Sequence, residues 1–177
     1  MSFELLIFCI AAAVAVIATA LVITRSNAVH ALLYLIVSFL AVAVMFFMLG
    51  APLAAALEVI IYAGAIVVLF VFVVMMFDLQ AGRPRRGPWM SVRAWTGPAA
   101  LAAVLLAELL AVLSRGGTHG LAPAAVPPRA VGLSLFGVYV LGVELAAMLL
   151  LAAVVGAYHL GSRKTASRHR LFEEPRP

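Results

Sequence analysis

The sequence has very little charge for its length. Only 11% of its 177 residues are charged, while 66% are hydrophobic. A soluble domain is typically about 25% charged and roughly 45–50% apolar. A chain with so little polar surface cannot cover an apolar core in water, which excludes a water-soluble globule. The mean hydropathy of +1.19 instead indicates a polytopic membrane protein.

The sequence is also nearly devoid of residues that bind metals or form disulfides. It has one cysteine, Cys9, inside the first apolar run, so no internal disulfide can form. The four histidines show no ligand spacing, and no iron–sulfur, haem or flavin signature is present. We therefore expect no metal and no cofactor in this chain. Any redox chemistry that it serves must use cofactors held by other chains.

Five apolar runs are long enough to cross a bilayer, which takes about 20 residues. No water in the hydrocarbon can bond free backbone groups, so each span must be helical. The predicted fold is all-α, with a five-helix membrane domain over 1–161 and a charged cytoplasmic tail over 162–177. The spans are expected near 3–24, 28–49, 53–77, 96–114 and 132–160.

The connections between these runs carry clear helix signals. Asn27 is a plausible N-cap for the second span, and residues 50–52 (Gly-Ala-Pro) predict a tight turn into the third. The first run is interpreted as a retained helix, because no Lys or Arg precedes it and Glu4 is acidic. The sequence contains no internal repeat and no stretch that predicts a soluble domain.

Lysine and arginine are divided unevenly between the two sides of the expected spans. Only Arg115 and Arg129 fall on one side, and the other ten fall on the opposite side. Cytoplasmic loops carry the excess of Lys and Arg, so the richer side is predicted to be cytoplasmic, with the N-terminus periplasmic. The net charge of +5 does not indicate nucleic acid, since the basic residues are few and lie in loops and the tail. The ten are Arg25, Arg83, Arg85, Arg86, Arg93, Arg163, Lys164, Arg168, Arg170 and Arg176.

Besides Glu4 at the very start of the first span, three of the seven acidic residues fall inside expected spans, namely Glu58, Glu108 and Glu144. A charged carboxylate at the centre of a bilayer costs at least about 2.5–3.5 kcal/mol. No expected span contains a Lys or Arg that could pair with it. These acids must therefore stay neutral, meet water or pair with another subunit.

The depth of each acid along its span favours different interpretations. At 1.5 Å per residue, Glu58 lies roughly 8 Å from the outer end of its span, Glu108 roughly 9 Å and Glu144 roughly 18 Å. For Glu58, an interfacial position near a helix start, where the dipole favours negative charge, and a functional position are equally open. For Glu108 we favour an orientation toward the headgroups over a functional role. Glu144 is too deep to reach the surface, and we favour a buried functional or inter-subunit contact.

Tyr62 and Gly64 stand out in the otherwise apolar third span. Tyr62 follows Glu58 at i+4, so the two side chains share a helix face. For the hydroxyl we favour a hydrogen bond to a backbone carbonyl over proton relay. The Ala63-Gly64-Ala65 stretch is typical of close helix packing. The functional alternative is a break in the hydrogen-bond ladder, since glycine weakens a helix interior and i→i+5 bulges favour functional sites.

Three stretches of the sequence resemble one protein family. They are EVIIYAGAIVVLFVFVVMM (58–76), NAVHALLYLIVSFLAVAVMFFMLGA (27–51) and GLSLFGVYVLGVELAAMLLLAAVVGAYHLG (132–161). They are similar to the J subunits of bacterial NADH:quinone oxidoreductase, which is respiratory complex I, and to their mitochondrial counterpart, NADH dehydrogenase subunit 6. The pattern E-x-x-x-Y-A-G-A-I-x-V-L-F-x-F is specific to this family. Ala28 stands where many relatives have proline, and Gly137 and Val138 replace a stretch that often contains one.

The resemblance implies a membrane-arm subunit of the bacterial inner membrane that couples quinone reduction to proton translocation. Such a subunit has no cofactor or active site of its own, and FMN, iron–sulfur clusters and quinone are expected in partner subunits. The expected partners are the quinone-binding subunit, small three-helix subunits and antiporter-like subunits, together with membrane lipid. Two alternatives remain open: a subunit of a related cation/proton antiporter or membrane hydrogenase complex, and a purely structural membrane scaffold.

The resemblance also implies a switch in the third span between a π-bulge and a regular α-helix, which opens or closes a water wire. The bulge is expected near residues 62–65, with π-type hydrogen bonding within 60–68. Tyr62 would be the polar group beside the wire, and we infer that Val67 and Phe70 form the dry gate that rotation moves. The candidates for the proton path and gate are therefore Glu58, Tyr62, Gly64, Val67, Phe70 and Glu144.

Overall fold

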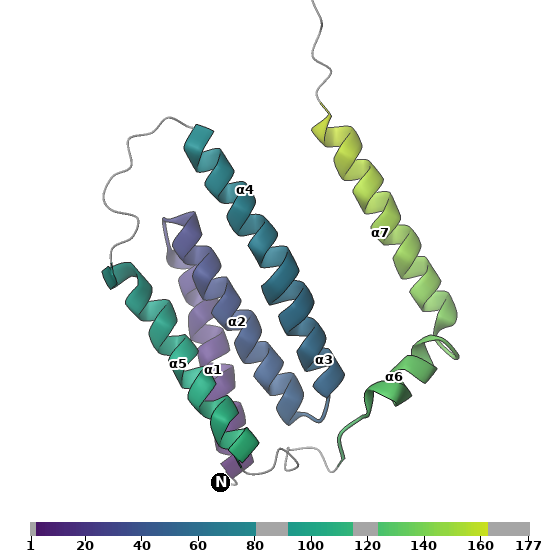
Figure 1. Cartoon of the computed structure of the whole chain (residues 1–177), viewed down its shortest axis with the longest axis horizontal. Coiled ribbons are helices and arrows are strands. Elements are labelled where there is room, and N and C mark those ends of the chain that lie inside the picture. The colour runs from purple at the N-terminus through teal and green to yellow at the C-terminus, as the bar shows by residue number, and fades with distance from the viewer. Residues whose placement is uncertain (1–2, 81–91, 115–123, 163–177) are drawn as a thin grey trace, which may run out of the picture. The chain divides into compact units, whose positions relative to one another are not determined.

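The computed structural model describes residues 3–80, 92–114 and 124–162, and the side chains of 78–80 and 92–94 lie outside that description (Figure 1). The described residues form helices and no strands. Most of the expected arginine-rich loop, Arg115 and the tail from Arg163 onward lie outside the described residues. The chain divides into two units, Met1–Pro128 and Arg129–Pro177.

Five described helices are long and apolar enough to cross a membrane, which confirms the expected number of spans. The third span is made of three consecutive segments, α3, η1 and α4, with η1 wound as a π-helix. The helices of the first unit are α1 (Phe3–Thr24), α2 (Ala28–Met48), α3 (Pro52–Leu57), η1 (Glu58–Ile66), α4 (Val67–Gln80) and α5 (Val92–Ser114).

The helix ends follow from local chemistry. The Asn27 side chain accepts hydrogen bonds from the backbone N–H of Val29 and of His30, at 3.0 and 3.4 Å, which confirms it as the N-cap of α2. Gly50 has φ of 75°, a left-handed conformation that glycine adopts without a Cβ penalty, and it closes the turn after α2. Pro52 then begins α3, where its missing N–H leaves no intrahelical bond unmade.

The core of the first unit lies where α1, α2 and α5 meet. Alanines of α1 and α2 form part of it, and small residues of this kind let membrane helices approach closely. One cluster consists of Val14, Ala15, Ala18, Val37, Ala41 and Leu105, and a second consists of Ile7, Met48 and Val112. The Thr19 and Ser38 hydroxyls also bond across α1 and α2 at 2.8 Å.

Helix α2 is the central element of this unit. It contacts α1, α5 and all three segments of the third span, and Figure 1 shows it between α5 and the third span. The third span is therefore positioned mainly by its packing on α2. No other helix of this unit contacts as many of its elements.

The second unit contains α7 (Val140–Gly161), and α6 (Pro128–Leu135) leads into it. The expectation of one continuous span over 132–160 is wrong, because the helix is interrupted at residues 136–139 and only α7 is long enough to cross. The interruption centres on Gly137, where an added Cβ would lie 2.7 Å from the Leu133 carbonyl oxygen. Tyr139 N–H bonds back to Ser134 at 2.9 Å. The sequence pattern alone did not reveal this break, because the run stays apolar through it.

Candidate functional site

The third span contains a π-helical segment, η1, from Glu58 to Ile66. At its C-terminal end the backbone N–H of Val67 donates to the Tyr62 carbonyl, an i→i+5 bond. This π-type hydrogen bond lies within 60–68, where it was expected. The segment is longer than the expected four-residue bulge and begins at Glu58 rather than near Tyr62.

Gly64 occupies a position in η1 where a side chain would be crowded. A Cβ built on Gly64 would lie 3.1 Å from the Val59 carbonyl oxygen, five residues earlier in the same helix. Because Gly64 has no Cβ, the Val59 carbonyl can lie close to it in the wider π turn. Glycine at this position is therefore matched to the π winding as well as to close helix packing.

The two proposed gate residues lie in different environments. Val67 is fully buried, with 0% of its surface exposed, whereas Phe70 is 51% exposed. Ala63, one turn before Val67, is also buried. Because η1 and α4 both contact α2, Ala63 and Val67 mark the packed face of the third span. The structure thus does not place Phe70 beside Val67 in the packed interior.

Tyr62 lies at the edge of the packed face, with 47% of its surface exposed. Its ring contacts Phe39 of α2, with a centroid separation of 5.5 Å and an interplanar angle of 52°. Glu58, at the start of η1, is half-buried. The two residues are separated by about one helical turn, so a shared face remains compatible with the geometry.

Glu144 lies on α7 and is exposed. Its expected depth of roughly 18 Å assumed a span that begins at residue 132, but α7 begins at Val140. Measured from that residue, Glu144 lies roughly 6 Å along the helix at 1.5 Å per residue. At this depth Glu144 is not too far from the helix start to reach the surface, and its contact with another subunit stays a prediction.

The expected orientation of Glu108 toward the headgroups is wrong. Its side chain is only 7% exposed, and both carboxyl oxygens are buried with no hydrogen-bond partner among the described residues. The position of Glu108 along α5 could be estimated from the sequence, but the face of the helix on which it lies could not. Glu108 shares the packed face with Leu105 and Val112, at i−3 and i+4. An unpaired buried polar group costs about 1–3 kcal/mol, so this residue needs an explanation.

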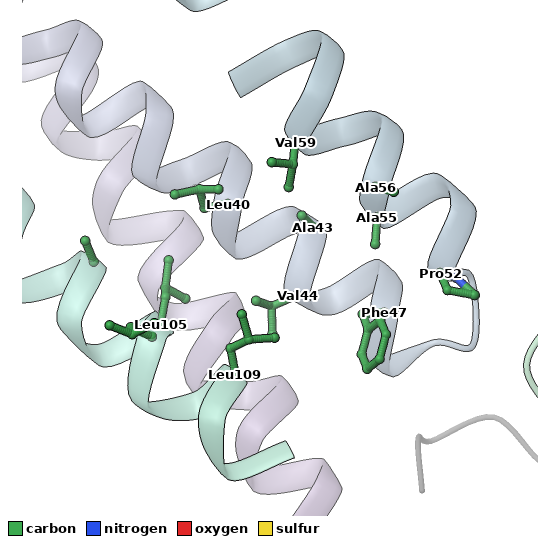
Figure 2. Close-up of a pocket in the computed structure, with 12 residues that line it drawn as sticks. Leu40, Ala43, Val44, Phe47, Pro52, Ala55, Ala56, Val59, Leu105 and Leu109 are labelled. Atoms are coloured by element: carbon green, nitrogen blue, oxygen red, sulfur yellow. The ribbon is translucent and has the colours of Figure 1, made fainter. Parts of the chain in front are cut away.

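A cavity of about 500 Å³ is lined by residues of α2, of α5 and of the beginning of the third span (Figure 2). In Figure 2, Leu105 and Leu109 of α5 lie on one side of α2, and Ala55 and Val59 lie on the other. All of the lining residues are apolar, so the cavity suits hydrocarbon rather than an ion. They are Leu40, Ala43, Val44, Phe47, Pro52, Ala55, Ala56, Val59, Ala102, Leu105, Leu106 and Leu109.

Comparison with known proteins identifies a matching family. The family model described as NADH-ubiquinone/plastoquinone oxidoreductase chain 6 matches residues 18–160. The matched region includes the π-helical segment, Glu108 and most of α7. It therefore includes four of the five membrane-spanning helices completely or almost completely, together with the last part of α1.

Several curated proteins are similar to this chain over most of their length. The NADH-quinone oxidoreductase subunit J of Pseudomonas aeruginosa is 60% identical over 156 residues, covering 87% of this chain and 94% of the relative. Subunit J of Escherichia coli K12 is 48% identical over 160 residues, covering 90% and 87%. Subunit J of Buchnera aphidicola from Acyrthosiphon pisum is 39% identical over 167 residues, covering 94% and 98%.

Proposed function

The chain belongs to the family of NADH-ubiquinone/plastoquinone oxidoreductase chain 6, and from this premise we propose that it couples quinone reduction to proton translocation. It is a membrane subunit of NADH-quinone oxidoreductase, of the type named subunit J in its relatives. Its five apolar helices make it a multi-pass membrane protein. Its partners are other subunits of the same complex.

The proposal also covers where the cofactors are bound, how the chain is oriented and which subunits it contacts. The chain has no active site of its own, and FMN, iron–sulfur clusters and quinone are bound by partner subunits. It lies in the bacterial inner membrane with its N-terminus periplasmic and its C-terminus cytoplasmic, as the distribution of Lys and Arg supports. It contacts the quinone-binding subunit, the small three-helix subunits and the antiporter-like subunits.

The proposed mechanism is a change of winding in η1. Conversion from i→i+5 to i→i+4 bonding shifts each hydrogen-bond partner by one residue. When a turn loses the extra residue of the π winding, the parts of the helix before and after it rotate relative to one another by about 100°. This rotation would carry Val67 out of its buried position and change which side chains of α4 face α2. Water would enter or leave the proton path as the apolar side chains move.

The observation that carries this mechanism is the π winding at Glu58–Ile66 with Gly64 inside it. The i→i+5 bond from Val67 to Tyr62 and the 3.1 Å approach at Gly64 both suit a segment with two windings of similar stability. Bulges of this type are frequent at functional sites.

The test of membership in the complex uses native membranes. The NADH-oxidising, quinone-reducing complex is purified from the source cells, and its subunits are identified by mass spectrometry. We expect this chain in stoichiometric amount. Its absence from an active, proton-pumping complex would overturn the proposed function.

Orientation is tested separately with reporter fusions. A reporter that is active only in the periplasm is fused after residue 114 in one strain and after residue 162 in another. We expect activity from the first fusion alone, because four spans precede it and five precede the second. Activity from the second fusion alone would reverse the orientation.

A further inference from the structure

Glu108 is a buried acidic side chain that has no part in the proposed switch. It lies on α5 between the two clusters of the core, three residues after Leu105 and four before Val112. Both of those neighbours are buried, at 5% and 8% exposed. The carboxyl group is thus held inside the bundle of α1, α2 and α5, in the first unit and away from η1 along the chain.

No charged group of the packed helices faces this carboxyl. Helices α1 and α2, with the turn between them, provide its neighbouring elements. Their described titratable and charged side chains are Glu4, Cys9, Arg25, His30 and Tyr34.

Arg25, His30 and Tyr34 lie near the N-terminal end of α5, far from Glu108. A Cβ on Gly97 would overlap the Tyr34 hydroxyl, so Tyr34 lies at the level of Gly97, roughly 16 Å along α5 from Glu108 at 1.5 Å per residue. Arg25 stacks over the same Tyr34 ring, 5.4 Å from its centroid. His30 lies one turn before Tyr34, further still from Glu108.

The two remaining groups also point elsewhere. Cys9 is exposed. Glu4 lies about one turn before Ile7, which packs with Val112, so Glu4 is beyond the level of Glu108 toward the helix end. With no cation facing it among the residues that the structure describes, an ionised Glu108 would be an uncompensated charge in an apolar core, which proteins avoid by neutralising the group.

A neutral carboxylic acid at this position still has an O–H donor and a carbonyl acceptor to satisfy. Both oxygens have no partner among the described residues.

We propose that Glu108 is a proton-binding site of the α1–α2–α5 core, a carboxyl group that is held as the neutral acid. Its ligand is a proton, and it lies on α5 rather than in the π-helical segment. The proposal stands whether or not η1 changes its winding, since it depends only on the burial and the surroundings of this one group.

The test is infrared spectroscopy of the purified complex in lipid vesicles at neutral pH. Wild type is compared with Glu108→Gln, which keeps size and polarity but cannot bind the proton. We expect the loss of one carboxylic-acid C=O band in the variant. In the wild type this band should shift when H2O is replaced by D2O, because the proton exchanges through water. Glu4→Gln, at the start of α1 and outside the proposed proton path, is the matched control and should leave the band in place.

Two results would overturn the proposal. No carboxylic-acid band lost in Glu108→Gln would mean that the group is ionised and paired with a partner subunit. A band that is lost but never shifts in D2O would mean that the site does not exchange protons. If Glu108→Gln lowers the yield of the complex, Glu108→Leu provides the same comparison, since the surrounding clusters are apolar.

Discussion

Gly64→Ala is the smallest change that tests whether the π winding matters. It adds one methyl group at 3.1 Å from the Val59 carbonyl oxygen, closer than the 3.4–4 Å of an ordinary contact. That carbonyl must therefore move by a few tenths of an ångström in the π form. A regular α-helix does not require residue i−5 to lie so close, so the methyl group disfavours the π form selectively.

The expected size of the effect follows from helix propensity. Alanine is about 0.8–1.0 kcal/mol more favourable than glycine in a helix interior. If this preference acts mainly on the regular α form, the π-to-α equilibrium shifts by about 1 kcal/mol, which is roughly fivefold in population. Crowding at the Val59 carbonyl adds to the same shift. The free energies of the two conformations of such an element usually differ by a few kcal/mol.

The assay measures coupling and structure in the same preparation. The purified complex is reconstituted into vesicles, and the protons translocated per NADH oxidised are measured together with the rate of quinone reduction. We expect fewer protons per NADH with quinone reduction retained. The structure of the variant should show Val67 N–H bonded to Ala63 rather than to Tyr62.

Gly142→Ala is the matched control. It is the same substitution in an apolar helix, but the added Cβ meets no atom within 4 Å among the described residues. It should leave the proton ratio unchanged. The reasoning is refuted if Gly64→Ala keeps both the Val67-to-Tyr62 bond and the wild-type proton ratio. Gly64 would then serve packing alone, and the chain would be a scaffold at this position.

Three further substitutions test how the helices of the first unit are held. Gly97→Ala should destabilise the α2–α5 contact by about 1–3 kcal/mol through overpacking, because its Cβ would lie 3.1 Å from Tyr34 Cζ and overlap the hydroxyl. Thermal unfolding measures this loss, and adding Tyr34→Phe should recover part of it. Asn27→Ala should cost about 0.5–2 kcal/mol by removing the N-cap of α2, whereas Asn27→Asp should be nearly neutral; equal losses would exclude the capping role. Ser38→Ala should cost about 0.6 kcal/mol, the average for interhelical hydrogen bonds in a membrane protein, by removing the 2.8 Å bond to Thr19, and an unchanged unfolding temperature would contradict it.

The sequence predicted local features well where one residue has one dominant preference. Asn27 caps α2 because its side-chain oxygen can reach the free N–H groups of the first turn. Gly50 and Pro52 mark the turn into the third span for the same kind of reason. Near Gly64, the weak point of the third span was expected from glycine and from family resemblance, and the structure has a π segment there.

The sequence could not assign helix faces. The fourteen residues of α4 are apolar almost throughout, so no polar stripe distinguishes buried Val67 from exposed Phe70. Glu108 was misassigned for the same reason, since every neighbour on α5 near it is apolar and any face could have been the packed one. In α7 the depth of Glu144 depended on where the helix begins, and continuous hydrophobicity concealed the break before Val140.

By itself, the sequence determined that the chain is a five-span membrane protein, because a bilayer requires long apolar helices and tolerates little else. It also determined where most of those helices begin and end, through residues whose backbone or side chain has a strong local preference. Only the tertiary structure decided which side chains face the core, how far the π winding extends, and that Glu108 is buried without a partner. Those outcomes depend on packing between helices, and uniformly apolar helices carry no pattern that reveals it.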